Sequence, residues 1–226
     1  MERVGVIVPA AGRSERMAGV DKLFLPLGSR PLLAWCLDTL EKSPIVARIV
    51  VSVSPERISD VESMSRERKW MKTAFVRGGA RRQDSVATAL DALDTVDWVL
   101  VHDGDRPFLT ESLIAHGLQA ARETGVAVAC LPVTDTVKVV DAEGLVVTTL
   151  ERDTLRSVQT PQIFRADIIR RAYSDIEETV TDDARLAERL GYAVRLYPGS
   201  RDNVKVTTPD DLLVAHAIAG RWEARS

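Results

Sequence analysis

The amino-acid sequence predicts an α/β protein with a doubly wound, mostly parallel sheet. Short apolar runs alternate with segments of helical spacing almost from end to end. Most of the runs are continuous in valine and isoleucine and do not alternate with polar residues. A strand that is apolar on both sides belongs in a sheet whose two faces are both covered, and short strand–helix–strand connections place its strands parallel with right-handed crossovers.

Each expected element follows from a local pattern. Strands are predicted at residues 4–9, 48–54, 73–77, 98–102 and 126–133. Helices with one broad apolar face are predicted at residues 31–42, 85–93 and 111–123. Ser54-Pro55 and Thr208-Pro209-Asp210-Asp211 predict helix starts, because a capping side chain is followed by proline at the first turn.

The alternation of strands and helices breaks once, at residues 135–159. Two β-branched runs flank Asp141-Ala142-Glu143-Gly144 there, which predicts a β-hairpin. On pattern alone, an edge hairpin of the main sheet is slightly favoured. The alternative is a projecting arm that pairs with a second subunit, because an isolated two-stranded ribbon is only marginally stable in water. No repeat or linker divides the chain, so residues 1–226 are expected to form a single domain.

The composition excludes several classes of protein. The 226 residues include 30 basic and 33 acidic side chains, a formal net charge of −3, whereas a general nucleic-acid binder carries a basic excess. Cys36 and Cys130 each lie in an apolar run, which favours buried thiols in a reducing compartment over a disulfide. No apolar stretch is long enough to span a bilayer, and the N-terminus lacks the layout of a signal peptide. We therefore expect a cytoplasmic protein that binds neither nucleic acid nor a membrane.

The loop after the first strand is a candidate phosphate site, because ligands of open α/β sheets bind beyond the carboxyl ends of the strands. Small residues at 10–12 are followed by cations, so backbone amides could approach a phosphate that Arg16 and Lys22 neutralise. The loop matches neither the dinucleotide fingerprint nor the Walker loop. An ordinary surface turn remains an equal alternative on these residues alone.

Three further strand ends carry charged residues. Residues 77–85 place two glycines and three arginines before a helix, a pattern typical of anion sites. Asp103 ends a buried run, where a carboxylate is costly unless it is paired or binds a metal, so it is a candidate Mg²⁺ ligand. Lys205 lies on an expected short strand before the last helix. Zinc and serine hydrolase motifs are missing, and the combination favours phosphoryl or nucleotidyl transfer.

Eight sequence blocks, in their order along the chain, resemble one known family. The blocks are PAAGRSERM, DKLFLPLG, GGARRQDSV, VHDGDRPF, PVTDTVK, ERDTLRSVQTPQIF, VTDDARLAERLG and PGSRDNVKVTTPDDLLVA. Together they resemble the 2-C-methyl-D-erythritol 4-phosphate cytidylyltransferases of the non-mevalonate isoprenoid pathway, over essentially the whole chain. The resemblance implies a Rossmann-like sheet of the nucleotidyltransferase type. It also implies transfer of CMP from CTP to 2-C-methyl-D-erythritol 4-phosphate, with release of pyrophosphate.

The resemblance further implies a role for each matching residue. The catalytic cations would be Arg16, Lys22 and Lys205. The nucleotide-binding residues would be Ala10, Ala11, Gly12, Gly79 and Ser85. The polyol phosphate would be bound by Asp103, Thr136, Arg152 and Thr160, and Asp103 would also hold Mg²⁺ or another divalent cation. Because Thr136 and Arg152 lie in the 135–159 segment, the resemblance implies a homodimer whose β-arm reaches the substrate of the other subunit.

The chain departs from the family pattern at two places. The usual Pro-Lys-Gln is Asp21-Lys22-Leu23, and the usual two alanines after the metal aspartate are Gly104-Asp105. We expect the extra carboxylate of Asp105 to tune the site. It would either face the metal together with Asp103, two residues away on an extended segment, or pair with Arg106 or Arg82.

Two rival functions stay open at this point. One is a cytidylyltransferase for ribitol 5-phosphate or another polyol phosphate, although the DTVK and NVKVTTPDDL segments favour methylerythritol phosphate. The other is a nucleotide-binding regulatory protein without activity, although the presence of Lys22 and Lys205 speaks against it.

Overall fold

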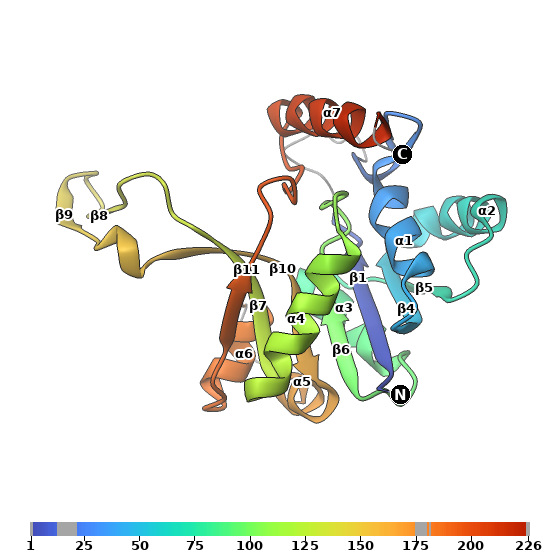
Figure 1. The fold of residues 1–226 in the computed structure, drawn as a ribbon, viewed down its shortest axis with the longest axis horizontal. Helices are drawn as coiled ribbons and strands as arrows, with labels where there is room; N and C mark the ends of the chain where they lie inside the picture. The colour runs from blue at the N-terminus through green and yellow to red at the C-terminus, as the bar shows by residue number, and fades with distance from the viewer. Residues whose placement is uncertain (1, 13–21, 175–179, 181, 225–226) are drawn as a thin grey trace.

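The computed structural model describes residues 2–12, 22–174, 180 and 182–224. Within these residues, seven strands form one sheet in the order β11-β7-β10-β6-β1-β4-β5 (Figure 1). In chain order the strands are β1 (Val4–Ala10), β4 (Val46–Val53), β5 (Thr73–Arg77), β6 (Trp98–Val101), β7 (Val126–Pro132), β10 (Arg156–Arg165) and β11 (Arg195–Pro198). Only β10 among them runs antiparallel to its neighbours, so the predicted mostly parallel sheet is confirmed.

Helices cover both faces of the sheet, as a doubly wound fold requires. They are α1 (Leu32–Lys42), α2 (Ile58–Arg68), α3 (Arg82–Asp91), α4 (Glu111–Thr124), α5 (Ala166–Tyr173), α6 (Ala184–Arg189) and α7 (Pro209–Glu223). In β1, Val4, Val6 and Val8 join the core with α1, α2, α4 and α7, whereas Ile7 joins the core with α3, α5 and α6. Successive side chains of a strand point to opposite faces, so both faces are buried. None of the described helices is both long and apolar enough to cross a membrane.

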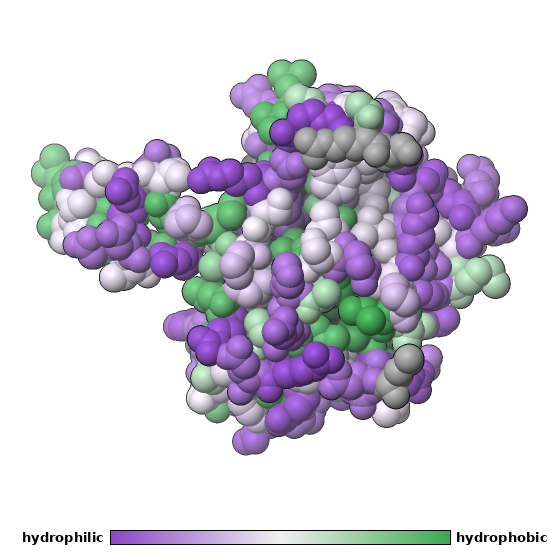
Figure 2. Space-filling view, viewed as in Figure 1, coloured by the Kyte–Doolittle hydropathy of each residue, from purple (hydrophilic) through white to green (hydrophobic). Residues whose placement is uncertain are grey.

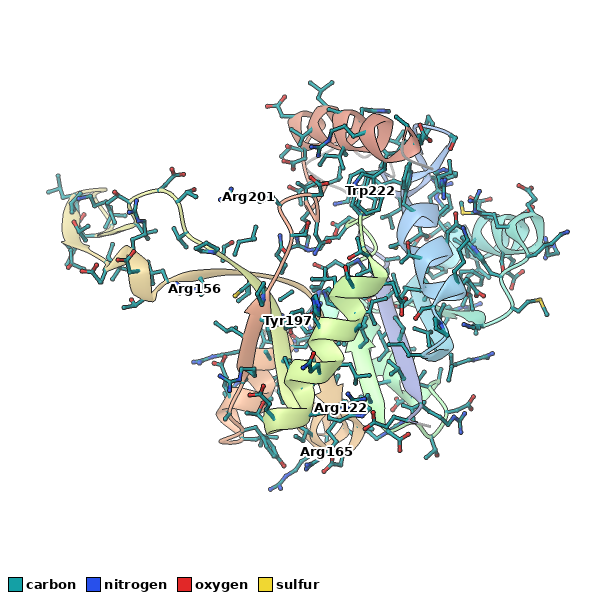
Figure 3. The ribbon with its side chains drawn as sticks, in the orientation of Figure 1. Arg122, Arg156, Arg165, Tyr197, Arg201 and Trp222 are labelled. Carbon is teal, nitrogen blue, oxygen red and sulfur yellow. The ribbon has the colours of Figure 1, made fainter. Side chains whose placement is uncertain are left out.

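Short elements complete the described chain. They are the 3₁₀ turns η2 (Lys22–Phe24), η3 (Pro55–Arg57) and η4 (Arg152–Thr154), and the strand pair β2 (Pro26–Leu27) and β3 (Arg30–Pro31). The last helix lies across the end of the molecule near the C-terminus (Figure 1). Its Trp222 points toward the rest of the protein (Figure 3), where its ring lies 5.1 Å from Phe108 and 6.3 Å from Trp35 between centroids. These aromatic contacts fix α7 over the loops at this end of the sheet.

Of the two predicted helix starts, the one at α7 is confirmed and the one at Ser54 begins a 3₁₀ turn. The capping box at α7 is confirmed, because the Thr208 hydroxyl accepts a bond from the Asp211 N–H at 3.2 Å, and Asp211 accepts one from the Thr208 N–H at 2.8 Å. Ser54 precedes η3, and α2 starts only at Ile58. The expected short strand around Lys205 is wrong. That segment is irregular and is held by the buried Asn203, whose amide donates to the Thr160 carbonyl at 2.7 Å.

The 135–159 hairpin is not part of the main sheet. Its strands β8 (Lys138–Val140) and β9 (Val146–Thr149) pair with each other in a separate sheet that projects from the body (Figure 1). The edge hairpin that the pattern alone slightly favoured is therefore wrong, and the projecting arm that the resemblance implied is confirmed (Figure 1). Both sides of β7 are already occupied, by β11 and β10, so the chain that follows β7 leaves the sheet. Hydrophobic side chains lie exposed at the free end of the arm (Figure 2), including Val146 at 60% and Leu145 at 67% exposure.

Candidate active site

A cavity of about 390 Å³ lies at the carboxyl ends of the parallel strands, where ligands of such sheets bind. Four stretches of chain bring most of the predicted site residues to it: the end of β1, the loop between β5 and α3, the loop after β6 and the loop before α7. The nucleotide-binding candidates that line it are Ala10, Ala11, Gly12, Gly79 and Ser85. Lys22, Asp103 and Lys205 line the same cavity. Arg16 lies outside the described residues.

The loop before α3 is packed so closely that only glycine fits at two positions. A Cβ atom on Gly78 would lie 2.2 Å from the Cβ of Ala11, and one on Gly79 would lie 2.3 Å from the Cβ of Asp84. The Gly79 N–H donates to the buried Ser85 hydroxyl at 3.0 Å. The backbone of this loop therefore lies against the end of β1 and forms one wall of the cavity.

Asp103 is a buried carboxylate surrounded by cations. Its Oδ1 accepts from Arg82 Nε at 3.0 Å, and its Oδ2 accepts from Lys205 Nζ at 2.9 Å. Burial alone would raise the pKa of Asp103, but Arg82 and Lys205 outweigh it and hold that pKa well below its usual range. Asp103 is therefore ionised at neutral pH and holds Lys205 in the lining of the cavity.

Arg82 joins Asp103 to a second buried carboxylate. Arg82 Nη1 and Nη2 donate to the two oxygens of Asp183 at 3.0 and 2.8 Å, a bidentate pair in which the Asp183 side chain is 0% exposed. The Tyr173 hydroxyl also donates to Asp183. Burial opposes the charge of Arg82, but Asp183 and Asp103 raise its pKa above the usual range. Both residues were missed as site residues, although Arg82 stands in the arginine-rich loop and Asp183 in the VTDDARLAERLG block.

Asp105 pairs with neither of the arginines expected for it. Its Oδ2 accepts from Lys22 Nζ at 2.7 Å. The expectation assumed an extended segment, but the Arg106 N–H donates to the Asp103 carbonyl at 3.0 Å, which closes a turn. Both carboxylates still line the large cavity, where Lys205 Nζ lies 2.9 Å from Asp103 and 4.0 Å from Asp105. Arg106 itself donates to the Asn203 carbonyl at 2.8 Å.

Thr160 lies at the floor of the site in a fixed hydrogen-bond chain. Its hydroxyl accepts from the Asp103 N–H at 3.0 Å and lies 3.2 Å from His102 Nδ1. His102 Nε2 lies 2.9 Å from the Arg106 carbonyl, which can only accept, so Nε2 carries the proton and Nδ1 accepts from Thr160. Burial lowers the pKa of His102 to about 4, so the ring is neutral at pH 7. His102 supports the loop after β6 and is not placed to act as a base.

A second, smaller cavity of about 170 Å³ adjoins the first. The two cavities share Arg82, Asp103 and Lys205, and the second is also lined by Thr160. The site thus has two compartments with a common wall of charged residues. Such an arrangement suits two anionic ligands that must meet.

Thr136 and Arg152 are not brought to the site of their own chain. Both are exposed on the arm, and Arg152 Nη1 donates to the Thr134 carbonyl at 3.1 Å. Neither lines either cavity.

Comparisons with known proteins agree with this geometry. The family model for 2-C-methyl-D-erythritol 4-phosphate cytidylyltransferase matches residues 4–221. The protein of that name from Dehalococcoides mccartyi is 46% identical over 218 residues, 96% of each chain, and that from Bacillus mycoides is 41% identical over 94% of this chain and 96% of the relative.

Solved structures with the same name or an equivalent one are also similar. The cytidylyltransferase of Thermus thermophilus superposes with a TM-score of 0.81 at 37% identity, over 97% of this chain and 100% of that one. The 4-diphosphocytidyl-2C-methyl-D-erythritol synthase of Anaerococcus prevotii superposes with a TM-score of 0.88 at 29% identity, over 97% of both chains. The chain therefore belongs to the 2-C-methyl-D-erythritol 4-phosphate cytidylyltransferase family.

Proposed function

We propose that this protein transfers CMP from CTP to 2-C-methyl-D-erythritol 4-phosphate, giving 4-diphosphocytidyl-2-C-methyl-D-erythritol and pyrophosphate in the non-mevalonate isoprenoid pathway. Membership of the family over residues 4–221 supports the reaction. The observation that carries the proposal is the pair of adjoining cavities with Asp103 and Lys205 between them. The larger, beside the glycine loop, is assigned to CTP, and the smaller, beside Thr160, to the polyol phosphate.

The chemistry needs charge neutralisation and no general base. A phosphate monoester has a second pKa of about 6, so the attacking oxygen is already ionised at neutral pH. This fits a site whose histidine, His102, is buried and neutral. The barrier is the approach of one anion to the α-phosphorus of another. Lys22 and Lys205, with Arg16 from outside the described residues, would offset that repulsion and stabilise the in-line transition state.

We propose that Mg²⁺ or another divalent cation binds beside Asp103, with the triphosphate supplying most of its ligands. No three His, Cys, Asp or Glu side chains converge on a metal position within the described chain. Mg²⁺ is commonly held by one or two carboxylates together with substrate phosphates. Asp103, whose carboxylate lines the large cavity, would be the ligand that the protein supplies. Bound there, the ion would neutralise charge on the triphosphate and on the departing pyrophosphate.

We also propose a homodimer in which the 135–159 arm of one subunit completes the site of the other. The exposed apolar end of the arm and the distance of Arg152 and Thr136 from their own cavities support it. Mixing an Arg152→Ala chain with a Lys22→Ala chain should restore activity, because one site of each heterodimer then holds both intact residues. Subunit exchange, shown with two affinity tags, is the control. Exchange without recovered activity would contradict the shared site.

We propose a cytoplasmic location because of the state of the two cysteine thiols. Cys36 and Cys130 are both buried and free of disulfides, as in reducing compartments.

Rates of pyrophosphate release across a panel of acceptors test the substrate assignment. With CTP and Mg²⁺, we expect the highest kcat/KM for 2-C-methyl-D-erythritol 4-phosphate and a lower one for ribitol 5-phosphate. The assay with each acceptor is repeated with ATP, GTP and UTP in place of CTP, which tests the specificity for the nucleotide. A preference for ribitol 5-phosphate would favour the rival cytidylyltransferase, and no release with any pair would favour a protein without activity.

A further inference from the structure

Asp105 adds a carboxylate to the nucleotide cavity that the chemistry of nucleotidyl transfer does not require. We propose that Asp105 is a positioning residue for Lys22, which it holds so that one N–H of the ammonium faces the incoming triphosphate. This inference rests on the proposed function, since it assigns the phosphate contact of the same reaction.

The hydrogen bonds of Lys22 leave one donor for a ligand. A lysine ammonium has three N–H groups. One is donated to Asp105 Oδ2 at 2.7 Å and a second to the Val206 carbonyl at 2.6 Å. No third acceptor for it lies among the residues that the structure describes, and Lys22 lines the large cavity with its side chain only 12% exposed. The remaining N–H is thus the one available to a phosphate oxygen.

The two acceptors of Lys22 belong to one rigid unit. The Val206 N–H donates to the Asp105 carbonyl at 2.9 Å, so these two residues, about a hundred positions apart in the chain, are held together through their backbones. The preceding Gly104 lies close to β1, where an added Cβ atom would be 3.2 Å from the Cβ of Ala10. The position of the Asp105 carboxylate is therefore set by the sheet and by the loop before α7.

Asp105 also lowers the positive charge that CTP meets. Its Oδ1 lies 4.0 Å from Lys205 Nζ, which is bound to Asp103. Removing the Asp105 carboxylate therefore has two effects that can be separated. Loss of the charge should strengthen the attraction for the triphosphate, and loss of the acceptor oxygen should release Lys22 from its orientation.

Two substitutions separate these effects. Asp105→Asn removes the charge and keeps an oxygen that can accept from Lys22, whereas Asp105→Ala removes both. At saturating polyol phosphate, we expect the KM for CTP to fall severalfold in both variants. We expect kcat to fall about tenfold in Asp105→Ala only, and to stay within about threefold of the parent in Asp105→Asn, because orientation acts on the transition state.

The matched control is Asp60→Asn. Asp60 lies on α2, forms an exposed ion pair with Arg57 and lines neither cavity. It should change neither parameter. Thermal unfolding confirms that each variant is folded. If Asp105→Ala does not fold, Asp105→Ser replaces it under the same criterion, because its hydroxyl is too short to reach Lys22.

Equal kcat values for the asparagine and alanine variants would overturn the positioning role, whether both are normal or both are low. A loss of stability with unchanged kcat in both variants would show a structural role only, and would overturn it too. Failure of the proposed function looks different, because then the parent protein itself transfers no CMP.

Discussion

Arg82 holds two buried carboxylates in place, and its removal should destabilise the whole site. Arg82 donates to Asp103 at 3.0 Å and to Asp183 at 3.0 and 2.8 Å. Arg82→Met keeps an unbranched side chain about as long as the arginine stem and removes all three charge-assisted bonds. Asp183, which is 0% exposed, would keep the Tyr173 hydroxyl as its one described side-chain donor, and Asp103 would keep Lys205.

The size of the effect follows from the uncompensated charge. Removing one partner of a buried ion pair costs about 3–5 kcal/mol, because the other charge stays buried. A domain of this length loses roughly 2–4 °C of Tm per kcal/mol, so we expect Tm to fall by about 6–20 °C. Asp183→Asn removes the charge that Arg82 compensates. The free energy of unfolding that the double variant loses should therefore be about 1–3 kcal/mol smaller than the sum of the losses in the two single variants.

Urea unfolding of the parent, both single variants and the double variant measures this coupling. Arg81→Met is the matched control, because the neighbouring Arg81 forms an exposed ion pair with Asp84 and should shift the unfolding midpoint far less. If the free energy of unfolding of Arg82→Met lies within about 1 kcal/mol of the parent value, or if the losses of the two single variants add, the buried network does not stabilise the fold.

Three further outcomes are expected. Lys22→Ala and Lys205→Ala should each lower kcat by roughly two to three decades while the folded state persists, and near-normal turnover of either would show that its lysine is misassigned. Burial raises the pKa of the Cys36 thiol to about 12. The pKa of the thiol in the unfolded chain is lower, about 8.5, so deprotonation at high pH favours the unfolded state. The free energy of unfolding should be unaffected by this thiol below about pH 8.5 and should fall by about 2–3 kcal/mol by about pH 10.5. Measured by urea unfolding, the free energy of unfolding of Cys36→Ala should fall less than that of the parent between these pH values. An identical pH dependence in the two proteins would contradict this role of the thiol. Val146→Asp, on the exposed end of the arm, should convert the proposed dimer to a monomer in analytical ultracentrifugation, and a persistent dimer would exclude this interface.

The strands that the sequence predicts are those with apolar side chains on both faces, such as β1. The strand β10 was missed because its sequence contains Gln159, Thr160 and Gln162, which are buried in the structure. Tertiary hydrogen bonds offset the cost of burying them. Gln159 donates to the Ser200 carbonyl at 3.0 Å, and Gln162 accepts from the Ala184 N–H at 2.9 Å. These partners are distant in sequence, so local pattern does not reveal them.

The position of the site could be predicted, but its charge pairing could not. Parallel topology places Gly12, Gly79 and Asp103 at one edge of the sheet, and all three line the same cavity. The pairing of Arg82 with Asp183 joins residues 101 positions apart, and the turn at Asp105 depends on backbone bonds that local pattern does not specify. The substrate roles of these residues remain predictions.

The identity of the product distinguishes CMP transfer to 2-C-methyl-D-erythritol 4-phosphate from every other reaction of CTP. The purified protein is incubated with CTP, 2-C-methyl-D-erythritol 4-phosphate and Mg²⁺, and nucleotides are identified by mass spectrometry while pyrophosphate is measured. We expect 4-diphosphocytidyl-2-C-methyl-D-erythritol and pyrophosphate in equal amounts, and neither product when either substrate is omitted. Free CMP in place of the linked product, or no consumption of CTP, would contradict it.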